Sequence, residues 1–334
     1  MRYHPPVAPT APVRFGVLGC AEIARRRMLP AITAAPDAEL AAVASRSAHT
    51  AAATARRHGG RPVVGYANLL ADDTVDAVYL PLPVALHAQW VEAALLAGKH
   101  VLAEKPLTTD PGRTRELLAL ARRRGLVLRE NVMFVHHPQH AVVRRLLAEG
   151  AIGELRALHA AFAIPAPADT DIRHDPDLGG GALWDVGLYP VRAAVHLLGP
   201  GLQTVGATLS AGAGRRVDTA GAALLRRADG VTAQLTFGME HAYRSAYQLW
   251  GSAGRITVDR AFTPPADHSP RILLERSGGT EPVEAAAADQ VVRALGEFTA
   301  AVRAARTGGA DTHDHTDLLA QADLLTAIRA TATP

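Results

Sequence analysis

Apolar strand-like runs alternate with amphipathic helix-like runs through the first third of the chain. The predicted strands are Val13–Leu18, Leu40–Ala44, Val75–Leu80, His100–Ala103 and Leu126–Leu128. The predicted helices between them are Glu22–Arg27 with Leu29–Ala35 (interrupted at Pro30), Ala48–His58, Leu86–Ala97 and Pro111–Arg124. Such alternation requires a parallel sheet covered by helices through right-handed crossovers. The sequence therefore predicts an α/β, doubly wound N-terminal domain.

The pattern changes after about residue 130. Helical runs at His140–Glu149 and Ala182–Leu198 accompany strand-like runs at Leu155–Ala163, Val217–Leu225, Val231–Phe237, Gln248–Trp250, Arg255–Val258 and Arg271–Glu275. Gly-containing turns separate these strands, which is typical of an antiparallel sheet. Helices at Val291–Arg306 and Thr316–Ala330 follow. We expect a loose N-terminal arm (1–12), a dinucleotide-binding domain (13–130) and a C-terminal α+β domain (131–334).

Composition excludes several classes of protein. The 334 residues are 48% hydrophobic and 20% charged with a net charge of +3, which is ordinary for a globular protein. No apolar run approaches the ~20 residues that span a bilayer. Arginines occur in short groups with few aromatic residues, so we expect no nucleic-acid partner and no membrane partner. A single cysteine, Cys20, excludes an internal disulfide and favours a cytoplasmic setting.

The segment that follows the first predicted strand is rich in small residues. It reads Gly19-Cys20-Ala21-Glu22-Ile23-Ala24-Arg25, a degenerate form of the dinucleotide fingerprint. Small side chains let the backbone approach a pyrophosphate, which the free N–H groups of the helix N-terminus then bind. Packing of helix against strand would explain the same small residues. Its place at the first strand-to-helix turn favours a cofactor site over that alternative.

Ser45, Arg46 and Ser47 end the second predicted strand. Sites that prefer NAD place an acidic side chain here to bind the ribose 2′-hydroxyl. A guanidinium between two hydroxyls suits a 2′-phosphate instead. The sequence therefore predicts NADP(H) as the cofactor, the alternative being that Arg46 only caps a surface loop.

Lys105 follows the buried run Val101–Ala103 in VLAEKPL, at the carboxyl end of a predicted parallel strand. Ligands bind at that edge of open α/β sheets. Low-dielectric walls and a nearby positive nicotinamide ring would both lower the pKa of a lysine, which suits it to proton transfer. The alternative is an ordinary solvated lysine at the end of a strand.

Several longer segments carry a family resemblance: GVLGCAEIA, ASR, PLPVALHAQW, GKHVLAEKPL and GGGALWDVGLYP. With them the chain resembles the Gfo/Idh/MocA oxidoreductases over nearly its whole length. The resemblance implies an N-terminal Rossmann domain and a C-terminal domain with an open antiparallel sheet. That sheet often serves as an oligomer interface in the family, so we expect a homodimer or homotetramer formed through it.

The resemblance also implies roles for individual residues. Leu82 and His87 would flank the nicotinamide half of the cofactor, and Asn131 would contact the nicotinamide region. Lys105 would be the general acid, in a loop shaped by Glu104 and Pro106. Asp185 would lie near the nicotinamide ribose and the substrate.

Two positions depart from the D-x-G-x-H-x-x-D pattern of the polyol dehydrogenases in this family. Tyr189 occupies the histidine position and Arg192 the last aspartate position. The histidine–aspartate proton relay is therefore absent, which argues against an inositol or glucose dehydrogenase. A tyrosine hydroxyl can hold or protonate a carbonyl oxygen, so the proton would come from Lys105, Tyr189 or both.

Within the family, HHPQH, LTFGMEHAY and RAFTPPA resemble nucleotide-sugar 3-ketoreductases of deoxysugar biosynthesis. The resemblance implies that NADPH reduces the C-3 ketone of a dTDP-3,4-diketo-2,6-dideoxyhexose to the 4-keto-2,6-dideoxy sugar. The substrate's pyrophosphate calls for cationic contacts. Arg26 and Arg173 are our candidates for contact with sugar nucleotide or cofactor, and Gln139 for contact with substrate.

Other interpretations stay open. An NADP-dependent sugar or trans-dihydrodiol dehydrogenase is one, and a non-catalytic NADP- and sugar-binding sensor is another, although retention of Lys105 favours an enzyme. His136, His137 and His140 lack the third ligand of a zinc site, so we predict no metal. Trp90 and Trp250 are predicted to be core residues, whereas Trp184 is a candidate for lining the cleft. The sequence leaves open the C-3 stereochemistry, the nucleotide base and the oligomer number.

Overall fold

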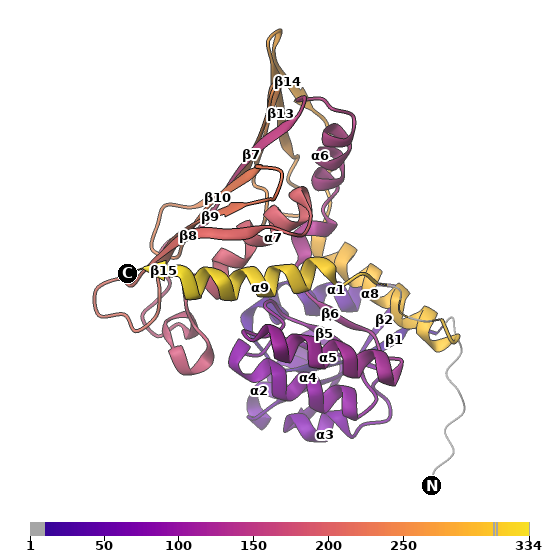
Figure 1. Ribbon diagram of the computed structural model, residues 1–334. Coiled ribbons are helices and arrows are strands. Elements are labelled where there is room, and N and C mark those ends of the chain that lie inside the picture. The colour runs from indigo at the N-terminus through magenta and orange to yellow at the C-terminus, as the bar shows by residue number, and fades with distance from the viewer. Residues whose placement is uncertain (1–10, 310, 312, 334) are drawn as a thin grey trace. The chain divides into compact units, whose positions relative to one another are not determined.

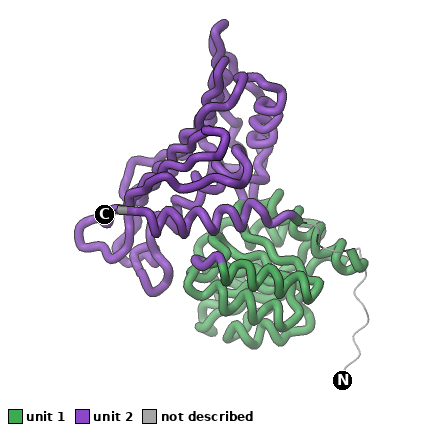
Figure 2. Tube along the Cα trace, viewed as in Figure 1, with its two compact units in different colours: residues 1–108, 112–132, 291–313 green, residues 109–111, 133–290, 314–334 purple. Residues whose placement is uncertain are grey.

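A computed structural model describes residues 11–309, 311 and 313–333. The predicted N-terminal arm lies almost entirely outside the described residues. The chain divides into two units, drawn in different colours in Figure 2. The first unit contains residues 1–108, 112–132 and 291–313, and the second contains residues 109–111, 133–290 and 314–334. Each unit is described below by itself.

The first unit is built on a six-stranded parallel sheet in the order β3-β2-β1-β4-β5-β6, with helices packed around it (Figure 1). Its strands are β1 (Val13–Leu18), β2 (Ala38–Ser45), β3 (Arg61–Val64), β4 (Ala77–Leu80), β5 (His100–Ala103) and β6 (Leu128–Glu130). Its helices are η1 (Ala24–Met28), α1 (Leu29–Ala34), α2 (Ala48–His58), α3 (Tyr66–Leu70), η2 (Val84–Leu86), α4 (His87–Leu96), α5 (Pro111–Arg124) and α8 (Gln290–Arg306). This strand order confirms the predicted Rossmann fold.

Helix α8 differs from the expected division of the chain, because nearly all of it belongs to the first unit. The ring of Phe298 lies 5.8 Å from that of Phe15 in β1, and Thr299 donates a 2.5 Å hydrogen bond to Asp37. Arg306 pairs with Asp76 at 2.8 Å. Sequence order alone places this helix with the second domain, whereas its apolar face is buried against the first sheet.

The second unit is built on a nine-stranded sheet in the order β14-β13-β12-β11-β7-β10-β9-β8-β15. Its strands are β7 (Leu155–Ala163), β8 (Gln203–Ser210), β9 (Ala220–Arg226), β10 (Thr232–Gly238), β11 (Arg244–Gly251), β12 (Gly254–Asp259), β13 (Arg271–Arg276), β14 (Gly279–Val283) and β15 (Ala332–Thr333). Most neighbours are antiparallel, as predicted, but β7 with β10 and β8 with β15 are parallel pairs. The strands β3, β8, β14 and β15 and helix α3 were not predicted, because they are short or strongly exposed.

The helices of the second unit are η3 (Met133–His136), α6 (Pro138–Ala148), η4 (Ile172–His174), η5 (Pro176–Leu178), η6 (Leu183–Gly187), α7 (Leu188–Leu198) and α9 (Thr316–Thr331). Helix α7 packs on the central strands β7 and β10, and α9 packs on α7 and β8 (Figure 1). Gly187 permits the close approach of this helical segment, since a Cβ there would lie 3.1 Å from the ring of Phe237.

The outer face of the second sheet keeps large apolar side chains exposed, namely Val205, Leu224, Trp250 and Leu273. The prediction that Trp250 is a core residue is wrong, because 42% of it is exposed. Its strand, β11, alternates between the two faces of the sheet, and Trp250 falls on the uncovered one. The ring of Trp250 lies 4.7 Å from that of His159 in the neighbouring strand, with the two ring planes tilted by 37°.

Candidate active site

The small-residue segment occupies the predicted place, between β1 and the first helical turn. Gly19 has a φ of 111° and its N–H donates to the Ala44 carbonyl at 2.9 Å. A Cβ on Gly19 would lie 2.9 Å from a methyl group of Leu82, so a larger residue would strain both its own backbone and its neighbour. The segment thus leaves backbone exposed where a phosphate would need it.

Residues 20 to 26 continue from Gly19 into η1, a π-helical turn. Cys20, Ala21 and Ile23 are partly exposed, Glu22 and Arg25 are exposed, and Ala24 is buried. Arg26 is exposed and pairs loosely with Glu22 at 3.7 Å. The other π-helical turn among the described residues, η6, contains Asp185. Single π turns occur often at functional sites.

The carboxyl end of β2 presents Arg46 to solvent between two ordered serines. The Ser47 N–H donates to Ser45 Oγ at 3.2 Å, and Ser47 Oγ caps α2 by accepting from Thr50 N–H at 3.3 Å. Arg46 lies beside Tyr66: burial raises the pKa of Tyr66, while the Arg46 charge acts in the opposite direction. Tyr66 Oη is also 3.8 Å from the Cβ position of Gly19. Tyr66 was missed in the sequence because its short helix was not predicted.

Glu104 joins three strands at the carboxyl edge of the first sheet. Its Oε1 accepts from Tyr79 Oη at 2.7 Å and from Asn131 Nδ2 at 2.8 Å. Glu104 and Asn131 are 8% and 2% exposed. The single oxygen of the Asn131 amide, Oδ1, is buried with no hydrogen-bond partner among the described residues. A buried unsatisfied acceptor is costly, so this atom indicates a missing donor such as a carboxamide.

Lys105 follows Glu104 directly and is partly exposed. The Lys105–Pro106 peptide is cis, and the Leu107 N–H beyond it donates to Glu130 Oε1 at 2.8 Å. The loop is thus held on one side by Glu104 and on the other by Glu130, at the end of β5. The chain contains only one other lysine, Lys99, whose Nζ donates to the Asp72 and Val75 carbonyls at 2.8 Å each.

His87 is 1% exposed and ties the predicted nicotinamide-flanking segment to the lysine loop. Its Nδ1 is 2.8 Å from the Pro106 carbonyl and its Nε2 is 2.7 Å from the Leu82 carbonyl. Burial lowers the pKa of His87, although both carbonyls favour the charged ring, which alone can donate to both. Its hydrogen-bond partners are backbone atoms, so the predicted cofactor contact stays a prediction.

In the second unit, Asp185 lies in η6 and pairs with Arg173. Arg173 donates from Nε to Asp185 Oδ2 at 2.6 Å, and from Nη1 to the carboxylate oxygens of Asp171 at 3.1 and 3.2 Å. Chiefly because of the Asp185 charge, the pKa of Arg173 is raised. Two carboxylates against one guanidinium leave the group with a negative balance. Arg173 therefore orients Asp185 and is poorly suited to binding a diphosphate.

Tyr189 lies one turn after Asp185, and aromatic residues surround its ring. The ring centroids of Phe162, Phe262 and Phe134 are 4.6, 5.9 and 6.0 Å away. All three phenylalanines are at most 4% exposed. Such packing fixes the direction in which the tyrosine hydroxyl points.

Gln139 and His140 are both fully buried in the same unit. Gln139 Nε2 and His140 Nε2 each lie 3.0 Å from the Ala261 carbonyl, and Tyr247 Oη lies 2.9 Å from His140 Nδ1. Burial lowers the pKa of His140 to about 3, so the ring is neutral. Among the described residues, no group of three or more His, Cys, Asp or Glu could hold a metal ion. The predicted substrate contact of Gln139 stays a prediction.

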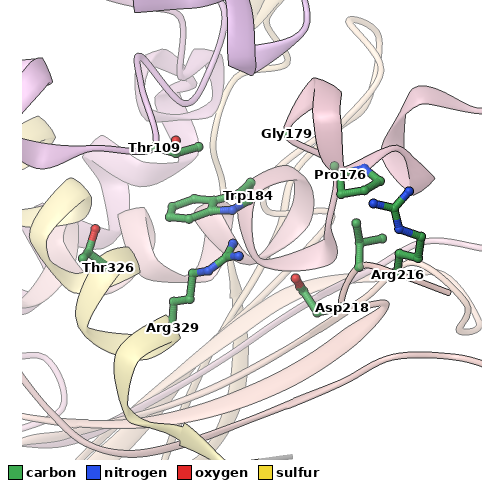
Figure 3. Close-up of a pocket in the computed structure, with 10 residues that line it drawn as sticks. Thr109, Pro176, Gly179, Trp184, Arg216, Asp218, Thr326 and Arg329 are labelled. Atoms are coloured by element: carbon green, nitrogen blue, oxygen red, sulfur yellow. The ribbon is translucent and has the colours of Figure 1, made fainter.

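Trp184 lines a cavity of about 430 Å³ within the second unit, and its predicted place in the cofactor cleft stays a prediction. Figure 3 shows its indole beside the Arg329 side chain of α9, with Asp218 nearby. The Arg329 guanidinium lies 5.7 Å from the indole centroid. Burial raises the pKa of Asp218, which accepts from Leu183 N–H at 2.7 Å and so holds the start of η6.

These features define a class of protein. A Rossmann sheet with a glycine cradle, an exposed arginine after β2 and an unsatisfied Asn131 oxygen fits a dinucleotide cofactor. A lysine at the carboxyl edge of that sheet can donate or accept a proton, which suits the site to the oxidation of alcohols and the reduction of carbonyl groups.

The chain belongs to the Gfo/Idh/MocA family. The family model described as "Oxidoreductase family, NAD-binding Rossmann fold" matches residues 13–132, and the "GFO/IDH/MocA C-terminal domain" matches residues 140–257. No helix in the described part of the chain is long and apolar enough to cross a membrane.

Its relatives include dTDP-3,4-didehydro-2,6-dideoxy-α-D-glucose 3-reductases. That of Streptomyces antibioticus is 50% identical, over 97% of this chain and 98% of its own. The enzyme of Streptomyces violaceoruber is 52% identical, over 96% of this chain and 95% of its own. A solved 3-ketoreductase from Actinomadura kijaniata, in complex with NADP and TDP-benzene, has a TM-score of 0.92 and 50% identity over 96% of this chain and 98% of its own. Lysine and tyrosine variants of that enzyme have also been solved, and the two altered positions are as far apart in its sequence as Lys105 and Tyr189 are here.

Proposed function

We propose that this protein is an NADP(H)-dependent sugar 3-ketoreductase. It reduces the C-3 ketone of a dTDP-3,4-diketo-2,6-dideoxyhexose to the dTDP-4-keto-2,6-dideoxy sugar. The observation that carries the proposal is about 50% identity to reductases of this substrate over almost the whole of both chains. The same spacing of lysine and tyrosine adds to it.

The first unit holds the cofactor through residues that the structure brings to one sheet edge. The backbone from Gly19 to Ala24 binds the pyrophosphate, and Ser45, Arg46 and Ser47 bind the 2′-phosphate. Asn131 Oδ1 accepts from the nicotinamide carboxamide, which satisfies its buried lone pairs. Arg46 makes NADP(H) the preferred form, because an exposed guanidinium gains a charged partner only from the 2′-phosphate.

NADPH, when bound, supplies the hydride for C-3. As the ketone becomes an alcohol, its oxygen needs a proton, and two groups of this chain can deliver it: Nζ of Lys105 and Oη of Tyr189. The Glu104 and Glu130 contacts hold the Lys105 loop in place, and the phenylalanines around Tyr189 direct its hydroxyl. Positioned acid catalysis of this kind contributes about 10²–10⁴-fold.

The decisive experiment follows NADPH absorbance after addition of freshly generated dTDP-3,4-diketosugar. We expect consumption of NADPH, much slower consumption of NADH, and a 4-keto-2,6-dideoxy product by NMR. Turnover of free xylose or of trans-dihydrodiols in preference to the nucleotide sugar would instead favour the dehydrogenase alternative. Binding of NADPH with no turnover of either substrate would indicate a sensor.

The open face of the second sheet supports assembly of identical chains. The cross-strand register places Leu224 of β9, Gln248 of β11 and Leu273 of β13 in one row. Trp250 lies two residues after Gln248 and therefore on the same face of β11. The side chains between Leu224 and Leu273 in that row are those of Gln234, His159, Gln248 and Thr257, so this face is a mixed apolar and polar surface of the composition found at protein interfaces. We expect a homodimer or homotetramer through this face, and Trp250→Arg should shift the mass measured by light scattering toward the monomer.

A further inference from the structure

The HHPQH segment, residues 136–140, places two fully buried polar side chains at the start of α6. Gln139 and His140 are both 0% exposed, and neither is one of the proposed proton donors or cofactor-binding residues. Burying a polar side chain is costly unless hydrogen bonds compensate it. The hydrogen-bond partners of the two side chains therefore indicate what they do.

Both side chains bond the same main-chain atom, the carbonyl oxygen of Ala261. Gln139 Nε2 and His140 Nε2 each lie 3.0 Å from it. A carbonyl oxygen only accepts, so the neutral ring of His140 carries its proton on Nε2. Its Nδ1 then accepts from Tyr247 Oη, 2.9 Å away. These two contacts fix the tautomer of the ring and commit its one N–H to Ala261.

Ala261 and Phe262 form a short segment in which all four main-chain polar groups are bonded. The Ala261 N–H donates to the Ser245 carbonyl and the Phe262 N–H donates to Ser245 Oγ, both at 3.0 Å. The Phe262 carbonyl accepts from Gln290 Nε2 at 3.1 Å. Ser245 and Gln290 are 4% and 3% exposed. Hydrogen bonds in such a low-dielectric setting are costly to break, so the segment is held in one position.

This segment carries the Phe262 ring, which lies 5.9 Å from the ring of Tyr189. His140 reaches the same tyrosine by a second route, because its ring lies 5.2 Å from that of Phe134, and Phe134 lies 6.0 Å from Tyr189. Phe134 and Phe262 also meet edge to face at 5.2 Å. Two of the three phenylalanines around Tyr189 are therefore supported by His140, one through ring packing and one through the Ala261 carbonyl.

Resting on the proposed function, we propose that Gln139 and His140 are positioning residues for the reduction. They fix the segment Ala261–Phe262, and through the Phe262 ring they fix the direction in which the Tyr189 hydroxyl meets the substrate ketone. A displacement of reacting groups by about 1 Å can lower a rate about 10²-fold. Loss of this support should therefore lower turnover and leave substrate binding nearly unchanged.

The test measures kcat and KM for the dTDP-ketosugar in variants of the two residues. His140→Phe keeps a ring against Phe134 but cannot donate to Ala261, so kcat should fall about 10- to 100-fold with KM within about threefold of wild type. His140→Gln returns an N–H donor near the position of Nε2 and should restore most of the lost kcat. Gln139→Leu removes the other donor to the same carbonyl and should also lower kcat, which tests the proposal if His140→Phe does not fold.

Tyr189→Phe supplies a readout that a merely structural role would not move. If His140 acts through the tyrosine hydroxyl, His140→Phe should lower kcat by no more than about twofold in the Tyr189→Phe background. Equal losses of kcat in the wild-type and Tyr189→Phe backgrounds would overturn the proposal.

Thr219→Val is the matched control in the same unit. Thr219 is 4% exposed and its Oγ1 accepts from the Gly212 N–H at 3.0 Å, so the variant also loses one hydrogen bond between a buried side chain and the main chain. It should lower thermal stability and leave kcat within about twofold of wild type. A fall in kcat as large as that of His140→Phe would mean that lost stability explains both, and the positioning role would be wrong.

Nitrogen NMR of the histidine side chains tests the arrangement in the wild type. We expect a neutral His140 ring with its proton on Nε2. A proton on Nδ1 alone would mean that the ring cannot donate to Ala261, and would overturn the proposal even if no variant folds.

The outcomes separate the positioning role from the reaction. If the wild type reduces the dTDP-ketosugar and both His140→Phe and Gln139→Leu turn over at the wild-type rate, the positioning role is wrong and the function stands. If the wild type reduces no ketosugar, the proposed function is wrong, and the positioning role that rests on it is wrong as well.

Discussion

Each unit holds one carboxylate at the centre of its candidate site, but by different means. In the first unit, neutral donors from Tyr79 and Asn131 hold the buried Glu104. In the second, a guanidinium that is itself 39% exposed holds Asp185, at 21% exposure. The buried carboxylate receives two hydrogen bonds to one oxygen and no ion pair that the structure shows, whereas the more exposed one belongs to a charged triad with Asp171.

The two carboxylates differ in how rigidly their partners hold them. A buried network of neutral donors is rigid, because breaking any one bond leaves a polar group unsatisfied in a low-dielectric setting. An exposed ion pair contributes little to stability and is screened by salt. We infer that Glu104 anchors the Lys105 loop, while the Arg173–Asp185 pair sets charge and direction with small effects on stability.

The largest effect should come from the residue that the rigid network positions. Lys105→Ala should lower kcat for the dTDP-ketosugar about 10²–10⁴-fold. Lys99→Met is its control: this lysine bonds only backbone carbonyls, so its loss should lower thermal stability and leave kcat of the folded enzyme within twofold. Equal losses of kcat in both variants would mean that Lys105 is structural.

Removing one neutral donor tests the rigidity of the first site. Tyr79→Phe deletes the hydroxyl that bonds Glu104 and should lower the free energy of unfolding by about 1.5–3 kcal/mol, the range for hydrogen bonds to charged groups. Urea denaturation followed by circular dichroism measures it. A loss below about 0.5 kcal/mol would show that the network is no more rigid than a surface contact.

Two histidines extend the comparison to pH. Burial lowers the pKa of His100 in the first unit to about 4 and that of His140 in the second to about 3. Unfolding returns each toward about 6.5, so the unfolded state binds more protons and stability falls as pH drops below that value. Each histidine contributes a slope of about 1.4 kcal/mol per pH unit, down to about pH 4 for His100 and pH 3 for His140.

His100→Asn is the matched variant, because its side-chain oxygen can still accept from Val127 N–H. Between pH 6.5 and 4 its unfolding free energy should depend less steeply on pH than that of the wild type, by the single-histidine slope. Urea denaturation at several pH values measures this difference. An unchanged slope would mean that His100 is protonated in the folded protein.

The smallest effect should come from the exposed triad. Asp171→Asn keeps an oxygen that accepts from the Arg173 N–H but removes one negative charge. The free energy of unfolding, measured by urea denaturation, should therefore fall by about 0.2–1 kcal/mol, and by less in high salt. A loss above about 2 kcal/mol would show that the triad is as stabilising as the buried network, and would remove the contrast between the units.

The sequence predicted the elements that obey a local period. Strand and helix alternation before residue 130, the cradle at Gly19 and the arginine at the end of β2 were found in their predicted places. It also placed Tyr189 and Asp185 on one helical segment, the predicted helix Ala182–Leu198, where the structure has η6 and α7. A further signal went unused: a chain rich in arginine has only two lysines, and only lysine can readily lose its proton.

What the sequence determined by itself was the class of fold, the cofactor edge and the identity of the motif residues, because each depends on neighbours within a few positions. Only the tertiary structure brought Tyr79 and Asn131 to Glu104, returned α8 to the first sheet and left Trp250 uncovered. It alone brought Gln139 and His140 to the Ala261 carbonyl. These contacts join residues far apart in the chain, and the packing of whole strands and helices decides them, which no local pattern encodes.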